Sequence, residues 1–303
     1  MSPDMNNKIA LHMCYWSGTK IGESLDSVIE YTARVAPDAL EMTPAAFLPL
    51  SRTERRELRK RIEDRGLTVT ANSGLMTPEN DTSSEDPAIR QKGLDHCARV
   101  LEACADMGSP YWSGLMHSAW CLKPDPRDPR GYKERTFARS VEAMKRVSRI
   151  AEDQGVVCAI ELVNRYEHFL LNTAGEGVEF CRAVDHPFCR ILLDVFHMSI
   201  EEDNIADAVT YAQESGYLCC IHVGETNRRI PAGGPTNVDW EAFGRAVRAS
   251  GFDGNLVLEP LPFSGSATAA KTCLWRDVSD PGDTDRLVED GRKAVALMRR
   301  LSR

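Results

Sequence analysis

Four side chains that could bind a metal ion stand inside short apolar runs of this sequence. They are Glu161, Asp194, His222 and Glu259. Burying one such group without a partner is costly, so we expect the four to share a cation. Three carboxylates and one imidazole form a hard, mostly oxygen donor set, which suits Mn²⁺, Mg²⁺ or Co²⁺ better than zinc. The sequence therefore predicts a divalent-metal site.

Each of these residues also has an ordinary structural explanation. An acid at the end of a strand is often a helix N-cap or a salt-bridge partner, and Asp194 could cap the turn that follows it. A single histidine in a strand, such as His222, is more often a core residue than a ligand. Four such residues at matching positions of four successive apolar segments favour the metal site.

Further polar and aromatic residues border the same predicted cavity. Glu167, His197 and Arg228 stand three or six residues after a proposed ligand. Arginine offers fixed donors to oxygen-rich substrates, and histidine can hold a hydroxyl or carbonyl oxygen. Trp16 and Trp120, in loops after the first and fourth strands, could form an apolar wall, although aromatic residues in such places are as often simply packed.

These residues lie in a regular alternation of short apolar runs and longer segments with helical periodicity. The strand-like runs are 8–15, 38–42, 67–73, 111–116, 156–163, 190–194, 218–223 and 255–259. The helical segments lie near 25–35, 51–65, 86–107, 133–154, 175–185, 201–215, 238–250 and 284–301. Glycines such as Gly108 and Gly155 follow several of the helical segments, as expected at helix C-termini.

Eight strands alternating with eight helices predict an α/β fold, a single (β/α)₈ TIM barrel, with one catalytic domain over residues 1–303. A doubly wound open sheet usually has fewer strands. Its nucleotide fingerprint is also missing, because Gly175-Glu176-Gly177 is not followed by a third glycine. In a barrel the strand ends converge on one mouth, where the active site lies.

Two long irregular stretches follow the third and fourth predicted strands. They cover residues 74–87 and 117–132. Loops after barrel strands lie on the catalytic face, and long loops without secondary structure are usually functional or disordered. We expect these two to form lids or pocket walls.

The bulk composition excludes several classes of protein. The net charge of -8, from 45 acidic and 37 basic residues, argues against a surface built for nucleic acid or an anionic membrane. No segment has eighteen uninterrupted apolar residues, and the polar N-terminus does not resemble a signal peptide. The ten cysteines are scattered through apolar runs without a CxxC pair, so we expect buried reduced thiols and a cytoplasmic protein.

Four ordered motifs resemble those of the ketose 3-epimerases. They are residues 161–167 (ELVNRYE), 193–202 (LDVFHMSIEE), 222–229 (HVGETNRR) and 258–260 (LEP). That family contains D-tagatose 3-epimerase and D-allulose (psicose) 3-epimerase, within the xylose isomerase-like barrels. Residues 12–18, 117–120 and 275–277 are similar to the family as well.

The resemblance implies an isomerase that acts on small ketoses. Its metal ligands fall on the same four residues, and its substrate contacts fall on Glu167, His197 and Arg228. It also implies that the bound metal is Mn²⁺, with Co²⁺ or Mg²⁺ as alternatives. The implied assembly is a homodimer or homotetramer. The implied reaction is C3 epimerisation of free ketoses of the tagatose/sorbose, fructose/allulose or ribulose/xylulose type.

Inverting C3 requires removal of the proton beside the C2 carbonyl and return of a proton to the opposite face. Removal leaves a cis-enediolate, which a metal ion would stabilise as a Lewis acid. A base on one face and an acid on the other are then needed. Glu161 and Glu259 are the two candidates that could flank the sugar.

Other functions remain open on the same scaffold. Residues 261–266 (LPFSGS) differ from the resembled family, where an aromatic residue and a basic glycine-rich turn are more usual. This difference leaves an epimerase of a modified or 3-oxo sugar as an alternative. An aldose–ketose or hydroxypyruvate-type isomerase would use the same metal but move a proton between neighbouring carbons.

Two other classes are less favoured. A metal-dependent nuclease of this superfamily would draw on many histidines, whereas the chain has only seven, most of them outside strand ends, and is acidic. A non-catalytic binding barrel would be expected to lack one of the four ligands or Arg228, and none is missing.

Overall fold

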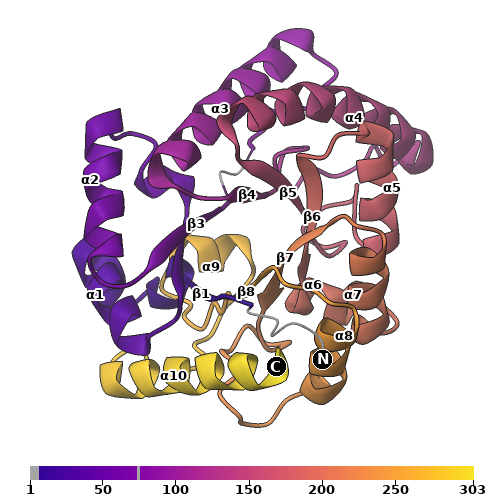
Figure 1. The fold of residues 1–303 in the computed structure, drawn as a ribbon. Coiled ribbons are helices and arrows are strands. Elements are labelled where there is room, and N and C mark those ends of the chain that lie inside the picture. The colour runs from indigo at the N-terminus through magenta and orange to yellow at the C-terminus, as the bar shows by residue number, and fades with distance from the viewer. Residues whose placement is uncertain (1–6, 74–75) are drawn as a thin grey trace.

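The computed structural model describes residues 7–73 and 76–303, and its centre is a closed barrel of parallel strands (Figure 1). The strands are β1 (Ile9–His12), β2 (Ala39–Met42), β3 (Thr68–Asn72), β4 (Tyr111–Gly114), β5 (Val157–Leu162), β6 (Cys189–Asp194), β7 (Leu218–Val223) and β8 (Asn255–Leu258). Each strand pairs with the next, and β8 pairs with β1, which closes the barrel. The predicted (β/α)₈ fold is confirmed.

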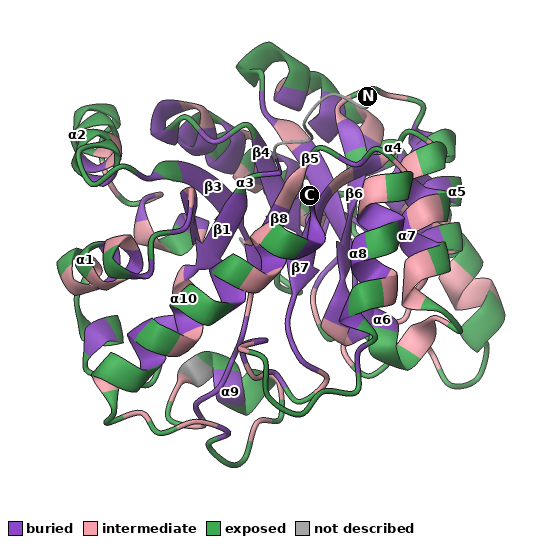
Figure 2. Ribbon diagram, turned by 60° about the horizontal axis from the view of Figure 1, so that its bottom comes forward, coloured by how far each residue is buried: buried purple, intermediate pink, exposed green. Residues whose placement is uncertain are grey.

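Helices form a ring around the barrel, as Figure 1 shows. The α-helices of the described residues are α1 (Leu25–Val35), α2 (Arg52–Glu63), α3 (Pro87–Met107), α4 (Pro129–Gln154), α5 (Ala174–Val184), α6 (Val195–Glu201), α7 (Ile205–Glu214), α8 (Trp240–Ala249), α9 (Ala267–Lys271) and α10 (Thr284–Leu301). Short α9 lies apart from this ring, at the end of the barrel where the chain leaves β8 (Figure 2). It therefore belongs to the face that the strand-end residues occupy.

The helix ends follow local signals that the sequence carries. Ser51 and Glu54 form a reciprocal capping box at the start of α2, in which each side chain binds the other residue's backbone N–H. The chain turns through the left-handed region after α3, at Gly108 with φ 73°. A residue without a Cβ adopts this conformation at little cost, so the predicted helix end is found where expected.

Some element boundaries differ from the prediction. The first strand stops at His12, because His12 Nδ1 accepts the backbone N–H of Cys14 and a 3₁₀ helix, Met13–Trp16, begins there. The helix predicted near 201–215 is α7, which begins after its N-cap Asn204, and the short α6 before it was not predicted. The five-residue α9 was not predicted, since it is too short to show a helical period.

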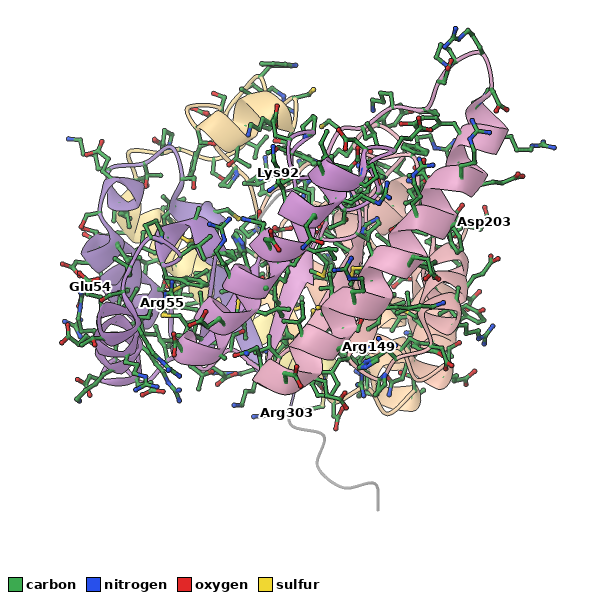
Figure 3. The ribbon with its side chains drawn as sticks, turned by 90° about the horizontal axis from the view of Figure 1, so that it is seen from above. Glu54, Arg55, Lys92, Arg149, Asp203 and Arg303 are labelled. Carbon is green, nitrogen blue, oxygen red and sulfur yellow. The ribbon has the colours of Figure 1, made fainter. Side chains whose placement is uncertain are left out.

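The core lies inside the barrel and between the barrel and its helices, and Figure 2 shows the strands as almost wholly buried. Charged side chains such as Glu54, Lys92 and Arg149 lie on the outside of the helical ring (Figure 3). Eight of the ten cysteine side chains are buried or half-buried, and none of the ten forms a disulfide. Among the described helices none is both long and apolar enough to cross a membrane.

The predicted loops 74–87 and 117–132 follow β3 and β4, although residues 74 and 75 lie outside the described part and residues 129–132 already belong to α4. The β4 loop is joined to the loop after β5. The rings of His117 and His168 meet edge to face with centroids 5.7 Å apart, and both are buried. Trp120 donates its indole N–H to Glu167 Oε2 at 3.2 Å. These contacts tie Trp120 of one loop to Glu167 of the other.

The buried histidine contact makes folding sensitive to acid. Burial lowers the pKa of His168 from 6.5 to about 4. Above pH 6.5 the ring is neutral in both the folded and the unfolded chain, so it does not change the stability there. Between pH 6.5 and 4 the unfolded chain takes up a proton that the folded chain does not, so stability falls as pH falls. The full loss is about 3 kcal/mol.

Urea unfolding between pH 7 and 4.5, with EDTA present, measures this effect. We expect the free energy of unfolding to fall more steeply with decreasing pH for the unsubstituted protein than for His168→Phe. The difference between the two slopes should approach the value for uptake of one proton, which is about 1.4 kcal/mol of unfolding free energy per pH unit. Parallel curves for the two proteins would contradict the neutral buried ring.

Candidate active site

The four predicted ligands meet at one mouth of the barrel. Glu161, Asp194 and His222 lie on β5, β6 and β7, and Glu259 directly follows β8. One ligand atom from each residue lies within 4.8 Å of the others. Parallel strands of a barrel end at the same face, so neighbouring strand ends bring these side chains together.

Asp194 fulfils both of the roles considered from the sequence. Its Oδ1 accepts the backbone N–H of Phe196 at 2.9 Å and caps α6. Its Oδ2 is buried without a hydrogen-bond partner and lies 3.5 Å from Arg228 Nη1. The cap fixes the carboxylate and leaves one oxygen directed at the cluster.

The cluster holds more negative charge than its neighbours neutralise. Burial, then the charge of Glu259, raises the pKa of Glu161 to about 8, and the same two causes raise that of Asp194 to about 7. Burial also raises the pKa of Glu259, but His222 and other nearby cations outweigh it and leave that pKa below its ordinary value. Without a cation these carboxylates compete for protons, so the donor set and its charge fit a divalent metal ion.

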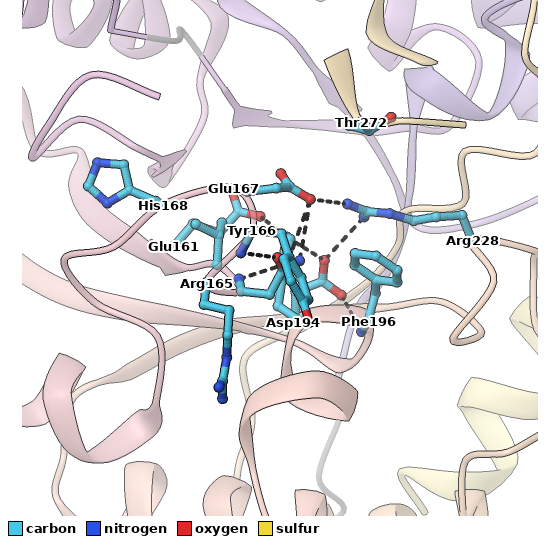
Figure 4. A network of polar contacts seen from close by, with 12 residues as sticks. Glu161, Arg165, Tyr166, Glu167, His168, Asp194, Phe196, Arg228 and Thr272 are labelled. Atoms are coloured by element: carbon cyan, nitrogen blue, oxygen red, sulfur yellow. Dashed lines mark hydrogen bonds and ion pairs between the residues drawn. The ribbon is translucent and has the colours of Figure 1, made fainter. Parts of the chain in front are cut away.

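Arg228 is the buried cation that contacts this cluster. Its Nη2 donates to Glu167 Oε1 at 3.2 Å (Figure 4), and its Nη1 lies 3.8 Å from Glu259 Oε2. The guanidinium carbon stacks 3.6 Å from the centre of the Phe196 ring. Arg165, in contrast, points away from the cluster in Figure 4 and pairs with Glu201 at 2.7 Å.

His197 presents an N–H group to the cluster. Its Nδ1 accepts the backbone N–H of Asn164 at 3.1 Å, so that nitrogen carries no proton. Burial, then the charge of Arg228, holds the pKa of His197 well below its ordinary value, and the ring is neutral. The proton is therefore on Nε2, which lies 3.7 Å from Glu161 Oε1 and 3.6 Å from Asp194 Oδ2.

A cavity of about 230 Å³ opens over the cluster, which is the size of a small molecule. Glu161, Glu259, Glu167, His197, Arg228 and Trp120 line it. Trp16, which we expected in its wall, lies outside it. Its ring is fully buried and donates its N–H to Thr32 Oγ1 at 2.9 Å, because the 3₁₀ helix after β1 turns the indole toward α1.

Sequence reasoning missed Glu41, which is fully buried inside the barrel on β2. Its Oε2 lies 2.9 Å from His222 Nε2, while Oε1 accepts hydrogen bonds from Thr70 and Tyr111, both at 3.1 Å. His222 Nδ1, on the other side of the ring, lies 3.1 Å from Glu259 Oε2. Glu41 thereby turns Nδ1 toward the cluster. The signal was present, since Glu41 is also a single acid inside an apolar strand.

Comparisons with known proteins show which family this barrel is similar to. The model of the xylose isomerase-like TIM barrel family matches residues 29–275. D-psicose 3-epimerase from Agrobacterium fabrum is 33% identical over 296 residues, 96% of this chain and 98% of that protein. L-ribulose 3-epimerase from Mesorhizobium japonicum is 29% identical, over 96% of this chain and 93% of that protein. A structure of D-psicose 3-epimerase with D-tagatose, from Clostridium cellulolyticum H10, superposes with a TM-score of 0.88 at 32% identity, covering 97% of this chain and 99% of that one.

The Glu41 contact predicts a loss of metal affinity when its charge is removed. In Glu41→Gln the amide no longer holds the Nε2 proton of His222 as a carboxylate does. We expect the affinity for Mn²⁺ to fall about 10- to 100-fold, the usual effect of losing a partner that orients a ligand. Titration of free Mn²⁺ followed by electron paramagnetic resonance measures it.

Thr70→Val is the matched control, because it removes one donor to Glu41 but keeps the carboxylate. It should bind Mn²⁺ more tightly than Glu41→Gln does. Unchanged affinity in a folded Glu41→Gln protein, judged by circular dichroism, would contradict the orienting role.

Proposed function

This chain belongs to the xylose isomerase-like TIM barrel family and, within it, to the ketose 3-epimerases, and from that membership we propose that it epimerises ketoses at C3 with the aid of a divalent metal ion. The observation that carries the proposal is the buried cluster of Glu161, Asp194, His222 and Glu259 beneath a cavity of small-molecule size. Its charge excess and its oxygen-rich donors support a bound cation.

Those four residues would hold the ion, which we propose to be Mn²⁺, with Co²⁺ or Mg²⁺ as alternatives. When bound, it supplies positive charge that draws electrons from substrate oxygens and so acidifies the neighbouring C–H. Asp194 and His222 act as holders, because each is fixed from outside the cavity: Asp194 by the cap of α6 and His222 by Glu41.

Glu161 and Glu259 move the protons. They come from strands separated by β6 and β7, and both line the cavity. A ketose between them would lose its C3 proton to one carboxylate, which leaves an enediolate over C2 and C3. The other carboxylate returns a proton to the opposite face. The sugar is inverted at C3, and the two glutamates exchange protonation states.

The other predicted residues that line the cavity position the sugar. Arg228 and the Nε2–H of His197 donate to substrate oxygens, and Glu167 holds Arg228 in place through the 3.2 Å contact. Trp120, held by Glu167, forms part of the wall. We further propose one catalytic domain over residues 1–303, from the alternation of eight strands and eight helices, and a cytoplasmic location, from the scattered cysteines. The resemblance adds a homodimer or homotetramer, which light scattering in solution would test.

An epimerase of a modified sugar is the second candidate. Leu261, from the unusual stretch 261–266, lines the cavity, and its backbone N–H donates to Arg228 C=O at 2.9 Å. Its side chain gives this part of the pocket wall an apolar surface. Such a wall favours a substrate with an altered or less polar end.

Solvent deuterium tests the reaction directly. Metal-loaded protein in deuterated water should place deuterium at C3 of D-fructose, D-allulose or another ketose of a panel, as read by NMR. Glu161→Gln and Glu259→Gln should each slow this exchange about 10²- to 10⁴-fold, because each removes one proton carrier.

Glu201→Gln is the control, since Glu201 pairs with Arg165 outside the cavity and should leave exchange nearly unchanged. Normal exchange in Glu161→Gln or Glu259→Gln proteins that still bind Mn²⁺ would overturn the two-glutamate mechanism. No exchange at C3 with any free ketose would favour the modified sugar.

A further inference from the structure

His12, the last residue of β1, reaches the same cavity from the side of Glu259. It is buried, with 3% of its surface exposed, and it lines the cavity. A ring nitrogen of His12, Cys14 Sγ and a carboxylate oxygen of Glu259 lie within 4.8 Å of one another. Its Nε2 has no hydrogen-bond partner. The mechanism above gives this buried nitrogen no role.

Hydrogen bonding determines where the proton of the ring sits. The backbone N–H of Cys14 donates to His12 Nδ1 at 3.0 Å, and an amide N–H can only donate. Nδ1 is therefore unprotonated. An imidazole ring keeps at least one N–H proton, so that proton is on Nε2. The unpartnered atom is a donor.

A second metal site at His12, Cys14 and Glu259 is the competing interpretation. The Cys14 thiol donates to Pro260 C=O at 3.3 Å, and burial raises its pKa well above its ordinary value. A thiol and an Nε2–H are both poor metal ligands until deprotonated. Binding a cation here would break the hydrogen bonds of both side chains, so the group is better suited to donate than to coordinate.

His197 offers the same tautomer on the other side of the cluster. Its Nε2–H lies 3.7 Å from Glu161, whereas His12 stands beside Glu259. The two imidazole rings therefore lie near the two proposed proton carriers, one beside each. An oxygen-rich molecule in the cavity would supply the acceptor that His12 lacks in the protein.

We propose that His12 is a substrate-binding residue whose Nε2–H donates a hydrogen bond to an oxygen of the ketose on the Glu259 side of the pocket. This assignment rests on the proposed function. It adds to Arg228 and His197 a third donor, contributed by β1, and makes the first strand part of sugar recognition.

Two substitutions test the roles of the two ring nitrogens separately. In His12→Asn the amide oxygen can replace Nδ1 as acceptor for Cys14, but the Nε2 donor is lost. In His12→Gln the amide nitrogen can replace the Nε2 donor, but the Cys14 acceptor is lost. We expect kcat/KM for C3 epimerisation of D-fructose to fall about 10-fold in His12→Asn, chiefly through KM, and to stay closer to normal in His12→Gln.

The reverse pattern, or equal losses, would overturn the assignment and leave His12 as a cap of the turn. A ¹⁵N spectrum of the histidine-labelled protein gives a readout without turnover. His12 should appear as the Nε2–H tautomer, and a proton on Nδ1 would overturn the assignment whatever the activity. Failure of the unsubstituted enzyme to exchange C3 with any ketose is a different result, which overturns the proposed function and this assignment with it.

Discussion

The excess of buried carboxylates at one mouth of the barrel is the constraint on which the rest of the site depends. Glu161, Asp194 and Glu259 share a small volume in which Arg228 is the guanidinium at contact distance. Burial and mutual repulsion raise the pKa of Glu161 to about 8 and that of Asp194 to about 7. A divalent ion would remove this conflict, because it replaces protons with a charge that all of these oxygens can share.

The surrounding structure holds the donors ready for such an ion. The backbone of α6 binds one oxygen of Asp194, and Glu41 binds the far side of the His222 ring. Glu41 is itself fixed by Thr70 and Tyr111. Asp194 and His222 are thus each fixed by a partner outside the cavity, and the polar chain that holds His222 runs from β2, β3 and β4 to β7. The ends of β5 to β8 carry the metal ligands, whereas the groups that would contact the sugar come from α6, from the loop after β7 and from the end of β1.

The barrel and the four-residue cluster could be predicted from the sequence, because an acid or imidazole in an apolar strand signals both the strand and its need for a partner. Asp194 shows the limit of that signal, since it is both a cap and a cluster member. Trp16 could not be placed, because its indole follows a 3₁₀ turn that only the fold determines. The role inferred for His12 depends on a backbone hydrogen bond two residues away, which no residue pattern reveals. Helix α9 lacks the length to show a period.

Crystals soaked with Mn²⁺ and measured at an anomalous wavelength test the central claim most directly. The account predicts one anomalous peak per chain at the mouth of the barrel, among the carboxylates of Glu161, Asp194 and Glu259 and on the Nδ1 side of His222. His222 Nε2 should remain on Glu41. A peak at another place, or no peak at this cluster in crystals that hold Mn²⁺ elsewhere, would contradict it.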